Sequence, residues 1–216
     1  MSDRTAFQRI RDEKGVVLEA VRHLLWLPRF DRLPKGDGHP VLVVPAFSVS
    51  DRGTTPLRRA LRRLDYDSHG WEQGPNRGVT PEAVAALEAH LAAIAGAAGR
   101  PVSVVGWSLG GIFARMIARS NPDAVRRVIA LGSPYRAAEE RHGVGTPPVP
   151  TTSIYSKSDA VVDWRNASEP DGPGRESIEV RGTHSGLALN PAVISIIAYR
   201  LALPAVSRRP GDRGDD

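Results

Sequence analysis

The sequence predicts an α/β fold with a mostly parallel, doubly wound sheet of about six strands and helices on both faces. Short apolar segments alternate with longer segments of helical periodicity, which is typical of a parallel sheet covered on both sides. No repeat period is visible, so the sequence does not indicate a solenoid. A length of 216 residues fits one domain with its own core.

The first elements of this alternation have clear local signals. Residues 40–47 (PVLVVPAF) form an apolar run that predicts a buried strand. A helix is expected from Thr55, with Pro56 in its first turn, and a weaker strand follows at 66–71. A second helix is expected from Thr80, because a threonine cap precedes a proline at the first helical position and a glycine closes the segment.

The later elements continue the pattern, so we expect the α/β domain to span residues 40–204. A tail at 205–216 is polar and contains proline and glycine, which predicts disorder. The remaining expected elements are a strand at 101–107, a helix at 109–120, strands at 125–133, 151–159 and 177–182, and a helix from Pro191.

Residues 1–39 precede the alternation and contain an amphipathic helix within 5–33, followed by a linker. We expect its apolar stripe to pack against the domain. Because a tryptophan and a phenylalanine lie next to basic residues in HLLWLPRF, a peripheral membrane contact or a homo-oligomer contact through 5–33 stays open. The apolar stripe consists of Val17, Val21, Leu24 and Leu25, whereas Glu19, Arg22 and His23 point elsewhere.

Composition and charge exclude several classes of function. The chain has no cysteine, which rules out disulfides, thiolate catalysis and cysteine-ligated metals, and we expect no metal site. The net charge is +5, but the arginines are dispersed without interleaved aromatic residues, so we expect no nucleic-acid partner. No signal-peptide pattern and no apolar run of ~20 residues is visible. We therefore expect a cytoplasmic protein, with the peripheral membrane contact as the alternative.

One serine stands between glycines at the junction of a predicted strand and a predicted helix, in GWSLGG. A G-x-S-x-G match is weak evidence alone, but here a strand directly precedes Ser108 and a helix directly follows it. Gly106, Gly110 and Gly111 allow strand and helix to approach closely. The helix start would direct N–H groups toward the serine. Ser108 is either a nucleophile or a cap, and the choice depends on a base and an acid.

A serine nucleophile needs an imidazole base and a carboxylate that orients it, in the chain order serine, acid, histidine for this arrangement. His184 follows the last predicted strand and precedes the last helix, where the base is expected. Asp159, at the end of the preceding strand, is the preferred acid, and Asp163 is the alternative. A second oxyanion donor is expected in the loop after the first strand, where the Phe47 amide is favoured over that of Ala46.

These segments resemble the small lipases and esterases of the α/β-hydrolase fold over residues 40–203. The resemblance is carried by VLVVPAF, GWSLGG, GSP, YSKSDAVV and GTHSGL. It implies that Ser108 is the nucleophile, Asp159 the orienting acid and His184 the general base. It also implies that the amides of Phe47 and Leu109 form the oxyanion hole.

The resemblance further implies a carboxylic-ester hydrolase that forms an acyl-serine intermediate and requires no cofactor. Residues 135–150 are too short and polar for a helical lid, so an open groove would accept small-molecule, lipid or polyester substrates. An acyltransferase or amidase with the same triad, and a non-catalytic binding protein on this scaffold, are the alternatives. The side chains expected at the substrate pocket are Ala46, Phe47, Trp71, Trp107, Val161, Val162 and Leu187.

Overall fold

A single sheet of six strands forms the centre of the computed structural model, which describes residues 16–142 and 144–205. The strand order is β2-β1-β3-β4-β5-β6 and every neighbouring pair is parallel. The chain runs outward from β1 to β2 and then returns to β3, so the order reverses between β1 and β3. Ligands bind at such switch points in open α/β sheets. The strands are β1 (Pro40–Val44), β2 (Asp67–His69), β3 (Val102–Trp107), β4 (Val125–Leu131), β5 (Thr151–Tyr155) and β6 (Arg175–Glu179).

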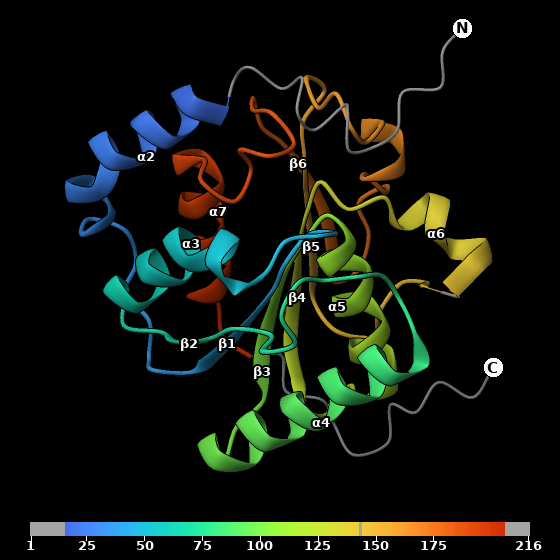
Figure 1. Cartoon of the computed structure of the whole chain (residues 1–216). Helices are drawn as coiled ribbons and strands as arrows, with labels where there is room; N and C mark the ends of the chain where they lie inside the picture. Colours follow the sequence, from blue (N-terminus) through green and yellow to red (C-terminus); the bar gives the residue numbers. More distant parts are fainter. Residues whose placement is uncertain (1–15, 143, 206–216) are drawn as a thin grey trace, which may run out of the picture.

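Helices cover both faces of this sheet, which confirms the predicted fold class (Figure 1). In β1, Val41 and Val43 join the core on one face, whereas Leu42 and Val44 join the core on the other. Burial on both faces explains why the strand is a continuous apolar run. The first face carries α2 (Val16–Phe30), α3 (Asp51–Arg63) and α7 (Pro191–Leu201), and the second carries α4 (Pro81–Ala98) and α5 (Leu109–Ser120).

The two helices expected from capping signals differ in outcome. In α4 the Thr80 hydroxyl accepts the Ala83 amide, and Gly99 ends the helix at φ 62°. In α3 the helix begins at Asp51, before the expected Thr55, so Pro56 lies inside it. The earlier start follows from Asp51, whose carboxylate accepts the backbone amides of Trp71 and Glu72. The start of α3 thus depends on the backbone at Trp71 and Glu72, 20 and 21 residues further along the chain, which the local sequence does not reveal.

Helix α2 packs against α3 and α7, but through the face opposite to the expected one. Leu24 and Leu25 of the predicted apolar stripe are 64% and 66% exposed, whereas Glu19 and His23 are buried. The polar residues lie inside because each has a hydrogen-bond partner in the loop before α7. The Val17 side chain lies outside the described residues. The expectation that this stripe packs against the domain is therefore wrong.

A further helix, α6 (Tyr135–His142), forms in the connection predicted to be too short and polar for a helical lid. Tyr135 and Ala138 are buried against Ile112 of α5, and the Arg115 guanidinium lies 4.0 Å from the centre of the Tyr135 ring. These contacts with α5 stabilise a helix whose own sequence contains few apolar residues. The helix therefore packs along α5 as part of the second layer (Figure 1).

No helix within residues 16–142 and 144–205 is long and apolar enough to cross a membrane. The tail expected to be disordered spans residues 205–216, of which 206–216 lie outside the described residues.

Candidate active site

Ser108 lies at the turn between β3 and α5, with backbone angles of φ 53° and ψ −117°. This conformation is strained for a residue with a side chain, and it lifts the hydroxyl out of the strand end. Glycines make the turn possible, because a Cβ atom at Gly106 would overlap the Gly110 carbonyl and one at Gly110 would overlap the Val44 carbonyl. Small residues therefore let β1, β3 and α5 approach one another directly beneath Ser108.

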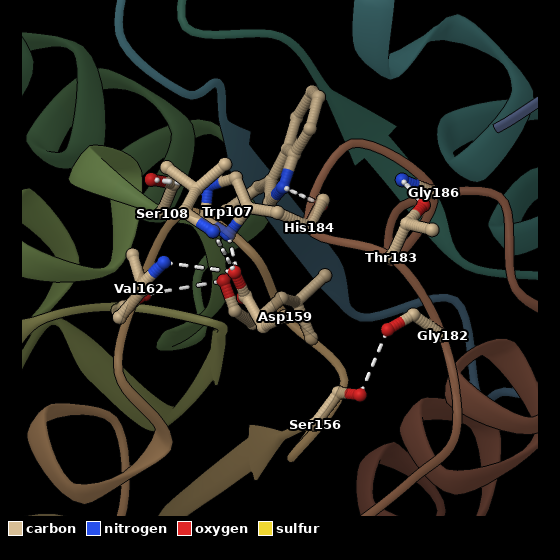
Figure 2. Close-up of polar contacts among 12 residues, drawn as sticks. Trp107, Ser108, Ser156, Asp159, Val162, Gly182, Thr183, His184 and Gly186 are labelled. Carbon is tan, nitrogen blue, oxygen red and sulfur yellow. Dashed lines mark hydrogen bonds and ion pairs between the residues drawn. The ribbon is translucent and has the colours of Figure 1, made fainter. Parts of the chain in front are cut away.

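His184 reaches Ser108 from the loop between β6 and α7. The His184 Nε2 atom lies 2.9 Å from the Ser108 hydroxyl oxygen, and its Nδ1 atom lies 2.7 Å from Asp159 Oδ2 (Figure 2). The side chains of His184 and Asp159 are 3% and 2% exposed. An ionised carboxylate only accepts hydrogen bonds, so Nδ1 carries the proton and Nε2 is left as the acceptor for the serine O–H.

Asp159, and not Asp163, makes this contact. Its other oxygen, Oδ1, accepts the backbone amides of Val161 and Val162, each at 2.8 Å, so both oxygens have N–H donors and the carboxylate is held in one orientation. Asp163 instead caps a short 3₁₀ helix, η1 (Trp164–Asn166), by accepting the Arg165 amide. The structure thus separates two acids that the sequence left as alternatives.

Two side chains at the strand ends donate hydrogen bonds to backbone carbonyls of the loop that carries His184. The Trp107 indole donates to the His184 carbonyl at 3.1 Å, and the Ser156 hydroxyl donates to the Gly182 carbonyl at 2.8 Å (Figure 2). Gly132, at the end of β4, adopts φ 54°, and a Cβ there would lie 3.2 Å from Asp159 Oδ2 and 3.3 Å from His184 Nδ1. The GSP motif thus leaves room for the Asp159–His184 pair.

The loop after β1 carries Ala46 and Phe47 and is anchored by Asn76. The buried Asn76 side-chain amide donates to the Pro45 carbonyl at 2.8 Å, and the Asn76 backbone carbonyl accepts the Ser48 N–H at 2.7 Å. Sequence reasoning missed Asn76 as an anchor of this loop. Its signal is a polar residue in a turn beside the site.

A pocket of about 390 Å³ opens over Ser108. The expected Ala46, Phe47, Trp107, Val161 and Val162 line it. The Phe47 side chain is 50% exposed, and Leu109 begins α5, whose positive dipole end faces the same space. The wall is mostly apolar, and the Ser108 hydroxyl and the His184 imidazole also line the pocket.

Comparison with known proteins addresses the fold. No protein-family model matches the sequence. The structure of an alpha-beta serine hydrolase homologue from Coxiella burnetii superposes with a TM-score of 0.61 at 15% identity, over 79% of this chain and 89% of that one. A monoacylglycerol lipase from Paleococcus ferrophilus gives 0.59 at 13% identity, over 78% and 96%. Lipase B from Aspergillus fumigatus gives 0.62 at 16% identity, over 78% of this chain but 53% of its own.

The chain has the α/β-hydrolase fold. At these identities the likeness concerns the fold alone.

Two expected pocket residues, Trp71 and Leu187, lie outside the pocket. Trp71 is 2% exposed, its indole N–H donates to the Gly74 carbonyl, and its ring packs edge-on against Phe113 in the core. Leu187 is fully buried among the side chains that pack beneath α7. Both are apolar residues at or after the end of a predicted strand, and the sequence does not show on which side their side chains point. Leu109, expected as an oxyanion donor, and Asp163, the alternative acid, also line the pocket, and the lining residues that sequence reasoning missed are Val49, Pro134, Asn166 and Ser185.

Proposed function

We propose that this protein is a serine hydrolase that cleaves carboxylic esters through an acyl-serine intermediate. The observation that carries the proposal is the continuous hydrogen-bonded series from Ser108 Oγ to His184 Nε2 at 2.9 Å and from His184 Nδ1 to Asp159 Oδ2 at 2.7 Å. A buried serine–imidazole–carboxylate series of this geometry activates the hydroxyl for nucleophilic attack. The names of the three similar structures, a serine hydrolase homologue and two lipases, also support a hydrolase.

In the acylation step, Ser108 Oγ attacks the ester carbonyl carbon while His184 Nε2 takes the hydroxyl proton. Asp159 holds the tautomer and stabilises the imidazolium that forms. The tetrahedral intermediate collapses as the carbon–oxygen bond to the alcohol breaks, and Nε2 returns the proton to the leaving alkoxide. The products of this step are the free alcohol and an acyl ester on Ser108.

In the deacylation step, a water molecule takes the place of the alcohol. His184 Nε2 accepts one water proton as the water oxygen attacks the acyl carbon, and Ser108 Oγ leaves and receives that proton back. In both steps the carbonyl oxygen becomes negative. The backbone amides of Phe47 and Leu109 are the donors proposed for it, and the N-terminus of α5 adds a favourable dipole.

The pocket suggests the class of acyl group. Its volume of about 390 Å³ lies near the lower end of the range for small-molecule sites, ~300–1,000 Å³. Val49, Val161 and Val162 provide apolar contact for an acyl chain. We therefore propose short to medium acyl chains as the preferred substrates.

The test is hydrolysis of p-nitrophenyl esters from acetate to palmitate, with Ser108→Ala as the control. The expected result is activity that is highest for short to medium chains and that falls by about 10⁴-fold or more in the variant. Full activity in Ser108→Ala would overturn the nucleophile assignment, and a wild-type protein inert toward the whole panel would overturn the ester substrate.

A further inference from the structure

Helix α2 turns a buried acid toward the loop that carries His184. Glu19 is 4% exposed. Its Oε1 atom accepts the backbone N–H of Thr183 at 2.9 Å, and its Oε2 atom accepts the Thr183 hydroxyl at 2.6 Å. Thr183 directly precedes His184 in the chain. Both carboxylate oxygens of Glu19 are therefore committed to the residue before the imidazole.

The loop is shaped to receive this carboxylate. Gly182 and Gly186 flank Thr183 and His184, and a Cβ atom at Gly182 would lie 2.7 Å from Glu19 Oε1, while one at Gly186 would overlap the carboxylate. The Thr183 hydroxyl, which donates to Glu19, also accepts the Gly186 amide at 3.2 Å. Figure 2 shows this last contact, which closes the loop around His184. The glycines thus leave the space that Glu19 fills.

A second contact from α2 holds the far end of the same loop. His23, one helical turn after Glu19, makes a hydrogen bond of 3.0 Å between its Nδ1 atom and the Leu189 carbonyl. Side chains four residues apart lie on one face of a helix, so α2 contacts the loop on both sides of His184. These contacts explain why the polar face of α2 points inward.

We propose that Glu19 is a positioning residue for the histidine: by binding both donor groups of Thr183, its carboxylate fixes the backbone from which the imidazole reaches Ser108 and Asp159. This inference rests on the proposed serine nucleophile. An imidazole that must meet two partners at once tolerates little displacement, since a shift of ~1 Å reduces rates by up to about 100-fold. Glu19 touches neither substrate nor reacting atoms and acts through Thr183.

The test compares three variants by the rate at which a fluorophosphonate labels Ser108, followed by intact mass, and by kcat and KM on the best ester. In Glu19→Ala the labelling rate and kcat are expected to fall by about 10- to 100-fold, with little change in KM. Glu19→Gln is expected to recover most of the rate, because its carbonyl oxygen can accept the Thr183 N–H and its amide can donate to the Thr183 hydroxyl. Leu25→Ala is the matched control, since Leu25 lies on the outer face of the same helix at 66% exposure.

Three results would overturn the proposal: wild-type labelling in Glu19→Ala, a Gln variant as slow as the Ala variant, or an equal loss in Leu25→Ala. If Glu19→Ala lacks the wild-type circular dichroism spectrum, Thr183→Val carries the test, because it removes the hydroxyl that donates to Glu19 and accepts the Gly186 amide, and it keeps the backbone N–H bond to Glu19. It is expected to label more slowly than wild type, and an unchanged rate in it would also overturn the proposal.

Labelling needs no ester, so the two proposals can fail separately. A wild-type protein that labels at Ser108 but cleaves no ester would defeat the ester substrate while leaving the Glu19 comparison readable. As a spectroscopic check, the downfield proton resonance of His184 Nδ1–H is expected to broaden in Glu19→Ala and to persist in Glu19→Gln.

Discussion

Gly132 borders the hydrogen bond between Asp159 and His184. Its φ of 54° suits glycine, and a Cβ there would lie 3.3 Å from His184 Nδ1 and 2.7 Å from Leu187 Cδ1. An alanine would combine backbone strain with close contacts to the hydrogen-bonded side chains of Asp159 and His184. We therefore infer that glycine at position 132 maintains the geometry of the Asp159–His184 hydrogen bond.

We predict that Gly132→Ala loses both stability and activity, whereas Gly174→Ala loses stability alone. Gly174 has a similar φ of 69° with nothing within 4 Å of the added Cβ, so it isolates the conformational strain of about 1–3 kcal/mol. Urea unfolding and Ser108 labelling by a fluorophosphonate measure the two effects. Equal labelling rates in the two variants would contradict the assignment.

At this scale the sequence identifies groups better than their pairings. Ser108 and His184 stand out because a local motif and the chain order indicate them. Asp159 and Asp163 remain alternatives, because both follow one strand within a few residues and only backbone donors distinguish them: the amides of Val161 and Val162 receive Asp159, and the Arg165 amide receives Asp163.

At the scale of elements, α5 is held to the loop after η1 by a buried ion pair. Arg115 and Glu169 have side chains 2% and 9% exposed, with contacts of 2.9 Å and 3.2 Å between the guanidinium and the carboxylate. Arg115 also donates to the Gly145 carbonyl at 3.1 Å. The helix that begins directly after Ser108 is thus tied to segments on either side of β5.

Glu169→Ala is predicted to lower the free energy of unfolding by about 3–5 kcal/mol, because it leaves the Arg115 charge buried without its partner. Glu179→Ala is the comparison, since the Lys157–Glu179 pair is exposed to solvent and is expected to contribute little. Urea unfolding monitored by tryptophan fluorescence provides both values. A Glu169 variant as stable as the Glu179 variant would show that the pair does not hold α5.

The elements also show where sequence-based prediction ends. Helix α4 is predictable from end to end, because Thr80, Pro81 and Gly99 determine its limits locally. Helix α2 is predictable as a helix, but its orientation depends on Glu19 and Thr183, which are separated by 164 positions. Periodicity groups the apolar side chains of α2 correctly and does not say which group meets the domain. The same limit applies to Trp71, whose partner Phe113 lies on another element.

At the scale of the whole molecule, a polar cluster lies at the end of the sheet opposite to Ser108. His39, just before β1, is fully buried, with Nδ1 2.6 Å from Asp37 Oδ1 and Nε2 3.0 Å from the Ser103 hydroxyl. Burial lowers the pKa of His39 below its usual 6.5, although the Asp37 carboxylate opposes this effect. Burial raises the pKa of Asp37, but hydrogen bonds from His39 and Arg100 outweigh it and hold that pKa well below its usual range.

Both shifts predict that acid destabilises the protein. Below pH 6.5 the unfolded chain protonates His39 while the folded chain resists it, so stability falls as the pH decreases toward the lowered pKa. Below pH 3.8 the unfolded chain also protonates Asp37 while the folded chain keeps it ionised. The stability that the ionised Asp37 contributes is therefore lost as the pH falls toward its lowered pKa. In His39→Gln the free energy of unfolding is expected to depend less on pH between 7 and 5, measured by urea titrations at each pH. Parallel curves for variant and wild type would refute the role of His39.

The orientation of α2 has a mechanical consequence. Its inner face makes hydrogen bonds to the loop between β6 and α7 at Thr183 and Leu189. Its outer face exposes Leu24 and Leu25, together with Arg22 and Arg29. A helix of this length is rigid, so a tilt of α2 caused by a contact at Leu24 and Leu25 would also displace the Glu19 carboxylate on the opposite face. If Glu19 positions His184 as proposed, a contact that tilts α2 through Leu24 and Leu25 would change the rate at which Ser108 is labelled.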